Sequence, residues 1–128
     1  AEATSDKIAL GWLLDGKVTA VVGTHTHVQT ADERVLPQGT AYISDLGMTG
    51  PYDSVLGRDK KRVVRFLTTG MPIYFDVATD DIHLCGVIVT ADGETGRATQ
   101  IRRVNIPFVP TPGPGSPGSP DDEDVGQE

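Results

Sequence analysis

Residues 18–27 read Val18-Thr19-Ala20-Val21-Val22-Gly23-Thr24-His25-Thr26-His27, a short apolar run that ends in two histidines. Residues 18–22 are rich in β-branched residues and apolar on both faces, which is typical of a buried parallel strand. The loop at the carboxyl end of such a strand is the usual place of an α/β active site. Imidazole is the commonest metal ligand and transfers protons near neutral pH. The stretch therefore predicts an α/β fold with a functional site at His25 and His27.

The segment before this strand predicts an amphipathic helix over residues 4–15. Two pairs of residues four positions apart would form its apolar face: Ile8 with Trp12, and Ala9 with Leu13. A helix that leads directly into a buried strand is one unit of an α/β layer.

The middle of the chain predicts one further strand and an ordered loop. Residues 40–44 alternate weakly between polar and apolar side chains and predict the strand. Residues 46–57 are rich in glycine and contain a proline, so they predict a loop and not a helix. Residues 58–67 fit a short helix with its apolar side chains inward, although a strand over residues 63–67 fits nearly as well.

The remainder of the chain predicts an antiparallel region followed by a tail. Three candidate strands, joined by short turn-rich connections, favour antiparallel pairing: residues 73–78, 82–90 and 97–105. Residues 107–128 hold six of the nine prolines and a cluster of acidic residues, and predict a disordered tail. We therefore expect one folded unit over residues 1–106.

Charge and cysteine content restrict the function classes. The net charge of −7 arises mostly in the tail, which holds five acidic residues and no basic one. Residues 1–106 carry 13 acidic and 11 basic residues without a basic patch interleaved with aromatic residues, so a binder of duplex nucleic acid is not expected. A single cysteine, Cys85, excludes an internal disulfide and predicts a reducing, cytoplasmic location. No apolar stretch is long enough to cross a bilayer.

Two interpretations of the histidine pair are open on the residues alone. In an extended backbone the side chains of His25 and His27 point the same way and can face one metal site. The other interpretation is a pair of surface histidines in a loop, because zinc usually takes three or four protein ligands and only two are present here. Asp45 follows the second strand and can approach the same sheet edge, whereas His83 lies inside a predicted strand and is expected to be structural.

The sequence around the histidines resembles a known motif. Residues 23–34 read Gly23-Thr24-His25-Thr26-His27-Val28-Gln29-Thr30-Ala31-Asp32-Glu33-Arg34 and closely resemble the last metal-binding motif of the calcineurin-like metallophosphoesterases. More specifically, the chain is similar to the bacterial YmdB family of cyclic-nucleotide phosphodiesterases. The similarity extends through the stretch Asp45-Leu46-Gly47-Met48-Thr49-Gly50-Pro51 and covers residues 1–106.

The resemblance implies a fold and an activity. The chain matches only the C-terminal half of the family's α/β/β/α sandwich, in which a mixed sheet faces an antiparallel one. By analogy His25 binds one of two divalent metal ions and His27 binds the other, the ions being iron or manganese with zinc as an alternative. The substrate would be a small phosphodiester of the 2′,3′-cyclic AMP kind, with Thr26, Met48 and Thr49 beside it.

The same resemblance predicts that the chain is incomplete as an enzyme. The other metal ligands and the general-acid histidine belong to the family's N-terminal half, so no catalytic residue is assigned within residues 1–128, which alone are expected to be inactive. The full-length protein is expected to form a homo-oligomer. Two alternatives are a CapA-like relative, against which the Asp45–Pro51 stretch argues, and a non-catalytic fragment or binding module.

Overall fold

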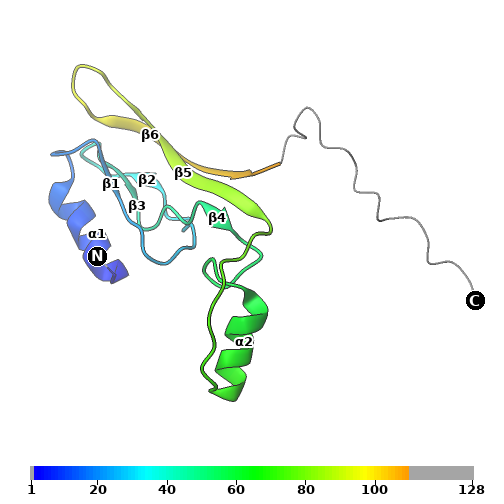
Figure 1. Ribbon diagram of the computed structural model, residues 1–128. Helices are drawn as coiled ribbons and strands as arrows, with labels where there is room; N and C mark the ends of the chain where they lie inside the picture. The colour runs from blue at the N-terminus through cyan, green and yellow to red at the C-terminus, as the bar shows by residue number, and fades with distance from the viewer. Residues whose placement is uncertain (1, 110–128) are drawn as a thin grey trace, which may run out of the picture.

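Two three-stranded sheets make up the computed structural model, which describes residues 2–109 (Figure 1). The elements in chain order are α1 (Thr4–Leu14), β1 (Ala20–Val22), β2 (Arg34–Val35), β3 (Ala41–Ile43), β4 (Gly50–Pro51), α2 (Lys60–Thr69), β5 (Ile82–Ala91) and β6 (Ala98–Pro107). In the first sheet, β3 lies between a parallel neighbour, β1, and an antiparallel one, β2. The second sheet, β4-β5-β6, is antiparallel throughout. The predicted α/β class, with one mixed and one antiparallel sheet, is confirmed.

The core is centred on β3, whose three residues are all buried. Burial continues past its end to Ser44 and Asp45. Because β3 is the central strand of its sheet, neighbouring strands cover both of its edges. Ser44 and Asp45, the polar residues that follow β3, are therefore buried at the carboxyl end of the central strand.

Helix α1 packs on β3 through a small residue and not through its large apolar ones. A Cβ atom on Gly11 would lie 2.7 Å from the ring of Tyr42, so the helix approaches the strand where it has no side chain. Lys7, one turn earlier, is buried on the same face. The apolar face predicted for this helix is wrong, because Trp12 and Leu13 are 50% and 64% exposed in the described structure.

Strand β1 has the predicted direction but not the predicted burial. It runs parallel to β3, as expected for the strand that precedes the histidine loop. It is an edge strand of the described sheet, and Val22 at its end is 46% exposed. In the described structure β1 therefore pairs with another strand along one edge only, and the apolar side chains of residues 18–22 are not fully buried.

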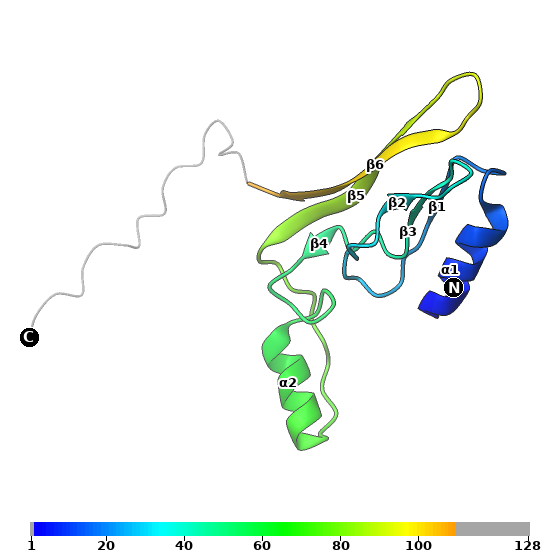
Figure 2. The same cartoon turned by 180° about the vertical axis from the view of Figure 1, so that it is seen from behind.

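The second half of the chain differs from the prediction at one strand. Residues 82–91 and 98–107 form the long hairpin β5–β6, as expected. Residues 73–78 form no strand; Val77 alone makes an isolated bridge, to Arg58. This segment returns alongside α2, away from both sheets, so its backbone groups pair with no strand of either sheet (Figures 1 and 2). Two very short strands, β2 and β4, were not predicted.

Helix α2 resolves the ambiguity of residues 58–67. The side chain of Asp59 accepts a hydrogen bond from the backbone N–H of Arg62 at 2.9 Å and caps the start of the helix. Gly70 ends it in the left-handed conformation, with φ of 66°. These two signals favour the helix over the strand, although α2 projects away from the sheets (Figure 2).

The remaining expectations concern the termini and membranes. β6 includes Pro107, the first residue of the range predicted as a tail, while residues 110–128 of that range lie outside the described residues. Among the described residues, the helices are too short or too polar to cross a membrane.

Candidate metal centre

The histidine loop begins at a close contact between the ends of β1 and β3. The N–H of Gly23 donates to the carbonyl of Ile43 at 3.0 Å, and the N–H of Leu46 donates to the carbonyl of Gly23 at 2.9 Å. A Cβ atom at position 23 would lie 1.9 Å from the carbonyl oxygen of Ser44, so only glycine fits here. This close approach brings residues 24–27 beside Asp45.

Asp45 holds the histidine loop from its buried side. Its side chain is 1% exposed, and its Oδ2 accepts a hydrogen bond from the N–H of Thr26 at 2.8 Å. Its Oδ1 accepts from the N–H of Gly47 at 2.9 Å, so one carboxylate joins the histidine loop to the glycine-rich loop. Burial raises the pKa of Asp45, but the hydrogen bonds from Thr26 and Gly47 and the nearby Lys7 charge together outweigh burial, and the pKa lies below its ordinary value.

Lys7 completes this support from helix α1. Its ammonium donates to the carbonyl of Thr24 at 2.7 Å and lies 3.5 Å from Asp45 Oδ2. Its side chain is 5% exposed, so the ion pair is buried. The sequence did not predict this role for Lys7. The feature that could have indicated it is the position of Lys7, one helical turn before Gly11 and on the same face of α1. Asp45, expected at this sheet edge, positions the loop, and both of its oxygens are engaged by backbone N–H groups.

The two histidines reach solvent on a strained loop. His25 and His27 have φ values of 125° and 64°, which are uncommon for residues with a Cβ. The extended backbone assumed for the pair is therefore wrong, and both residues are exposed. Strained backbone in non-glycine residues is concentrated at functional sites, where surrounding contacts hold it in place. Here the contacts of Lys7 and Asp45 supply that restraint.

The ring of His27 is held in one tautomer. Its Nδ1 lies 3.2 Å from the carbonyl oxygen of Leu56. Because a carbonyl only accepts hydrogen bonds, Nδ1 carries a proton, and in the neutral ring Nε2 then keeps its lone pair. Metal-ligating histidines are commonly oriented in this way, by donating the other ring N–H to a carbonyl. Leu56 itself has a φ of 53°, and nothing in its sequence position points to this role.

The donor set fits part of a metal site. Two imidazoles, one with its Nε2 lone pair directed by a hydrogen bond, suit a transition-metal ion. Within residues 2–109, however, no group of three or more histidine, cysteine, aspartate or glutamate side chains is arranged to hold a metal. His25 and His27 therefore fit a metal only as contributors to a larger ligand set.

The other residues expected beside the substrate lie in the same region. The Oγ1 of Thr26 donates to the carbonyl of Val28 at 3.1 Å, which closes the turn between the histidines and the following residues. Met48 is half-buried, and its N–H donates to the hydroxyl of Tyr52 at 3.3 Å. Thr49 is exposed and donates to the carbonyl of Cys85 at 3.5 Å. Met48 and Thr49 anchor the glycine-rich loop, and neither lines the cavity next to His27.

The remaining polar candidates have structural partners. His83 contacts Asp81 and Asn105, in agreement with the structural role expected for it. Asp32 accepts hydrogen bonds from Thr30 and from the N–H of Ser44, and so supports the end of β3.

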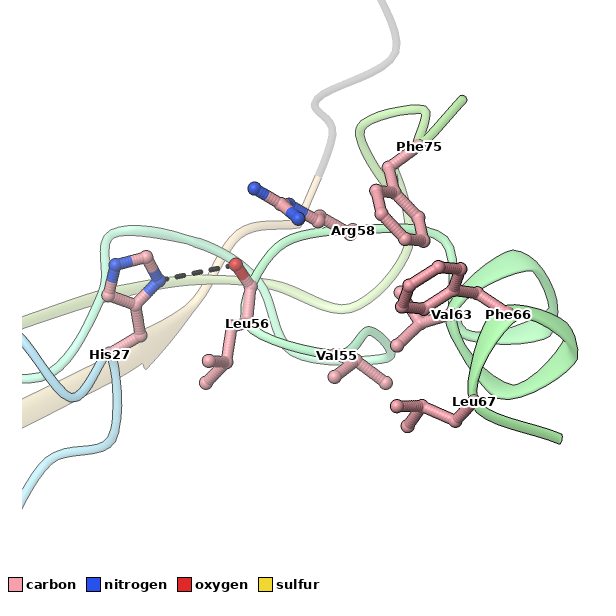
Figure 3. A pocket seen from close by; sticks show the side chains of 8 residues that line it. All are labelled: His27, Val55, Leu56, Arg58, Val63, Phe66, Leu67 and Phe75. Atoms are coloured by element: carbon pink, nitrogen blue, oxygen red, sulfur yellow. Dashed lines mark hydrogen bonds between the residues drawn. The ribbon is translucent and has the colours of Figure 1, made fainter. Parts of the chain in front are cut away.

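A cavity of about 360 Å³ adjoins His27 (Figure 3). It lies between the histidine loop, residues 55–58 and the apolar face of α2. Figure 3 shows the His27 ring at one end and the rings of Phe66 and Phe75 at the other. This cavity was not predicted, because its walls come from segments that are far apart in sequence.

Fold and site together define an α/β protein with a histidine loop at the carboxyl end of a parallel strand. The chain belongs to the YmdB-like protein family, whose sequence pattern matches residues 1–104. It is 55% identical over 106 residues to a 2′,3′-cyclic-nucleotide 2′-phosphodiesterase of Bacillus subtilis (strain 168), and the match covers 83% of this chain and 40% of that protein.

Two crystal structures are similar to this one. A hypothetical protein of Thermus thermophilus is 40% identical with a TM-score of 0.76, over 84% of this chain and 42% of that one. A novel phosphatase of Mycoplasma pneumoniae is 39% identical with a TM-score of 0.77, over 84% of this chain and 38% of that one. The chain thus spans about 40% of the length of the curated relative described above.

Proposed function

We propose that this chain supplies His25 and His27 to a dinuclear, metal-dependent phosphodiesterase that acts on 2′,3′-cyclic nucleotides or related phosphodiesters. The name of the Bacillus relative supports the substrate class. The observation that carries the proposal is the His27 ring, whose Nδ1–H is held by the Leu56 carbonyl so that Nε2 can act as a ligand. The ions are two divalent cations, iron or manganese, with zinc as an alternative.

The chemistry divides between the ions and the protein. Two cations supply charge neutralisation of the phosphate and stabilisation of an in-line displacement when they are bound. The imidazoles of His25 and His27 are neutral ligands, so they hold cations without adding negative charge that would repel the phosphate. Asp45 and Lys7 keep the strained histidine loop in its conformation, which preorganises the two rings.

Within this proposal residues 1–128 alone do not turn over substrate. The described residues contribute two ligands. The other ligands come from an N-terminal half, for which the longer relatives have enough additional length. The full-length protein is a cytoplasmic homo-oligomer in the same proposal. The match to the YmdB-like family favours this branch over a CapA-like relative.

Hydrolysis and metal content test the proposal together. The complete gene product is assayed with manganese against 2′,3′-cyclic AMP and bis-p-nitrophenyl phosphate, with His25→Ala, His27→Ala and the control His83→Ala. We expect the first two variants to lose both metal and activity and the control to keep them. The same assay on residues 1–128 should show no turnover, and turnover there that His25→Ala abolishes would refute the claim of inactivity.

A binding module is the second candidate, because the described residues hold no complete metal-ligand set. Metal analysis of the complete, purified protein separates the two functions. Bound transition metal that is lost in His27→Ala supports the enzyme. Absence of any tight manganese or iron binding supports the module.

A further inference from the structure

The cavity next to His27 has the size and lining of a small-molecule site. Its volume of about 360 Å³ lies at the lower end of the range for ligand pockets, roughly 300–1,000 Å³. Its walls are mostly apolar side chains, to which Arg58 adds one charged group. Such pockets combine apolar walls with a few polar groups that orient the ligand. His27 belongs to its lining, so the cavity is continuous with the candidate metal centre (Figure 3).

The wall nearest His27 is a hydrogen-bonded turn. Val55 and Arg58 exchange two backbone hydrogen bonds, of 2.9 and 3.0 Å, and close a tight turn around Leu56. Leu56 sits in that turn with a positive φ, and its carbonyl is the partner of the His27 ring. The same turn therefore shapes the cavity and orients the candidate ligand. A strained, well-restrained turn with two such roles is typical of a functional site.

The far wall is aromatic, and the planar cation of Arg58 lies against it from the near wall. The rings of Phe66 and Phe75 meet edge to face, with centroids 5.6 Å apart. The guanidinium of Arg58 lies 5.0 Å from the centre of the Phe75 ring. A guanidinium presents five N–H donors in a plane and stacks on aromatic faces. Aromatic rings together with arginine are the side chains on which unpaired nucleobases stack.

We propose that this cavity binds the nucleobase of the substrate, with Phe66 and Phe75 against the base and Arg58 donating to its ring nitrogens. The proposal rests on the proposed function and extends it, because it assigns the base to α2 and the 55–58 turn while the phosphate lies at the histidine loop. A phosphodiester without a base would leave the cavity empty. The site thus favours cyclic nucleotides over base-free cyclic phosphates.

A kinetic comparison tests the specificity. The complete gene product is assayed on 2′,3′-cyclic AMP and on glycerol 1,2-cyclic phosphate, which has no base. Removal of one stacking partner costs roughly tenfold in affinity. We therefore expect Phe66→Ala to raise KM for the nucleotide about tenfold with little change in kcat, and to leave both constants for the glycerol compound unchanged. Val64→Ala is the matched control, since Val64 is exposed on the same helix and does not line the cavity.

A binding measurement separates this proposal from the proposed function. Adenosine, which has no phosphate, is titrated into the protein in EDTA and followed by NMR. Adenosine binding that Phe66→Ala weakens about tenfold supports the base site even if hydrolysis fails in every assay. Arg58→Met keeps a stem over Phe75 without the donors, and provides a second variant should Phe66→Ala unfold.

Two results would overturn the proposal. One is the absence of adenosine binding, or an equal affinity in the wild type and in both cavity variants. The other is a change of oligomeric state in Phe66→Ala, measured by light scattering, with adenosine affinity unchanged. That second outcome would assign the apolar face of α2 to contact between copies of this chain.

Discussion

Replacement of Asp45 by asparagine tests whether the buried ion pair with Lys7 holds the histidine loop. Asparagine keeps the size of the side chain but has one acceptor oxygen where the carboxylate has two. Since Oδ1 accepts from Gly47 and Oδ2 accepts from Thr26, one of these N–H groups would face an NH₂ group. The ammonium of Lys7, 5% exposed, would also lose its counter-charge.

The expected cost follows from these contacts. Hydrogen bonds to a charged group contribute about 1.5–3 kcal/mol each, and breaking one side of a buried ion pair costs about 3–5 kcal/mol. These contributions overlap, so we expect Asp45→Asn to lower the free energy of unfolding by about 3 kcal/mol. The exposed pair Asp53–Lys60 is the matched control, with side chains 46% and 50% exposed. Water screens an exposed pair, so Asp53→Asn should change the free energy of unfolding little.

The pH dependence of unfolding provides a second test of the ion pair. The pKa of Asp45 is lower in the folded state than its ordinary value of 3.8. Its stabilisation is therefore fully present above pH 3.8 and is lost as the pH falls through the folded-state pKa. Urea unfolding at about pH 7, 5 and 3 should show a difference between wild type and Asp45→Asn that is constant at the upper two values and smaller at the lowest.

Hydrogen exchange of the Thr26 amide provides a separate, local test of the same contact. This amide donates to Asp45, so the variant should exchange faster at that position. A cost for Asp45→Asn no larger than that of Asp53→Asn would refute the supporting role of the buried pair. Unchanged exchange at Thr26 would refute its coupling to the histidine loop.

Two further predictions concern packing and a titrating histidine. Gly23→Ala should lower the free energy of unfolding by roughly 3 kcal/mol or more in a urea titration, because the new Cβ meets the carbonyl of Ser44. Gly93 faces open space, so Gly93→Ala should cost far less in the same titration. Equal costs would contradict the close approach at Gly23. The hydrogen bonds to Asn105 and then to Asp81 raise the pKa of His83 above 6.5, so its stabilisation is present below pH 6.5 and is lost as the pH rises through the folded-state pKa. NMR titration should show that raised pKa falling in Asn105→Ala; no change there would contradict the assignment.

Local patterns in the sequence were sufficient for elements that are stabilised by their own residues. The hairpin β5–β6 carries a turn between two strand-forming runs and was predicted. Residues 58–67 were left open between helix and strand, although α2 carries its own cap at Asp59 and its stop at Gly70. The parallel pairing of β1 was predicted from its β-branched residues, which are apolar on both faces. Residues 73–78 have strand-like composition but lie beside no strand to pair with in the described structure, and composition does not report where a segment lies.

The candidate site likewise combines features that the local sequence determines with features that the tertiary structure determines. The motif at residues 23–27 singled out His25 and His27 as candidate ligands from sequence, because the residue type and the preceding strand are local features. Their geometry was not local: the loop is held by Lys7 from α1 and by Asp45 after β3. The predicted apolar face of α1 failed for a related reason, since periodicity does not show that the ring of Tyr42 leaves room only for glycine at position 11.

The two histidines proposed as metal ligands lie in one short stretch of chain and could therefore be singled out as candidates without coordinates. Which side chain supports which loop depended on the packing of residues 17 to 38 positions apart. The cavity beside His27 is the clearest case, because its walls come from the histidine loop, the 55–58 turn, α2 and Phe75. A cavity exists only where such walls meet, and the fold of the chain decides where they meet.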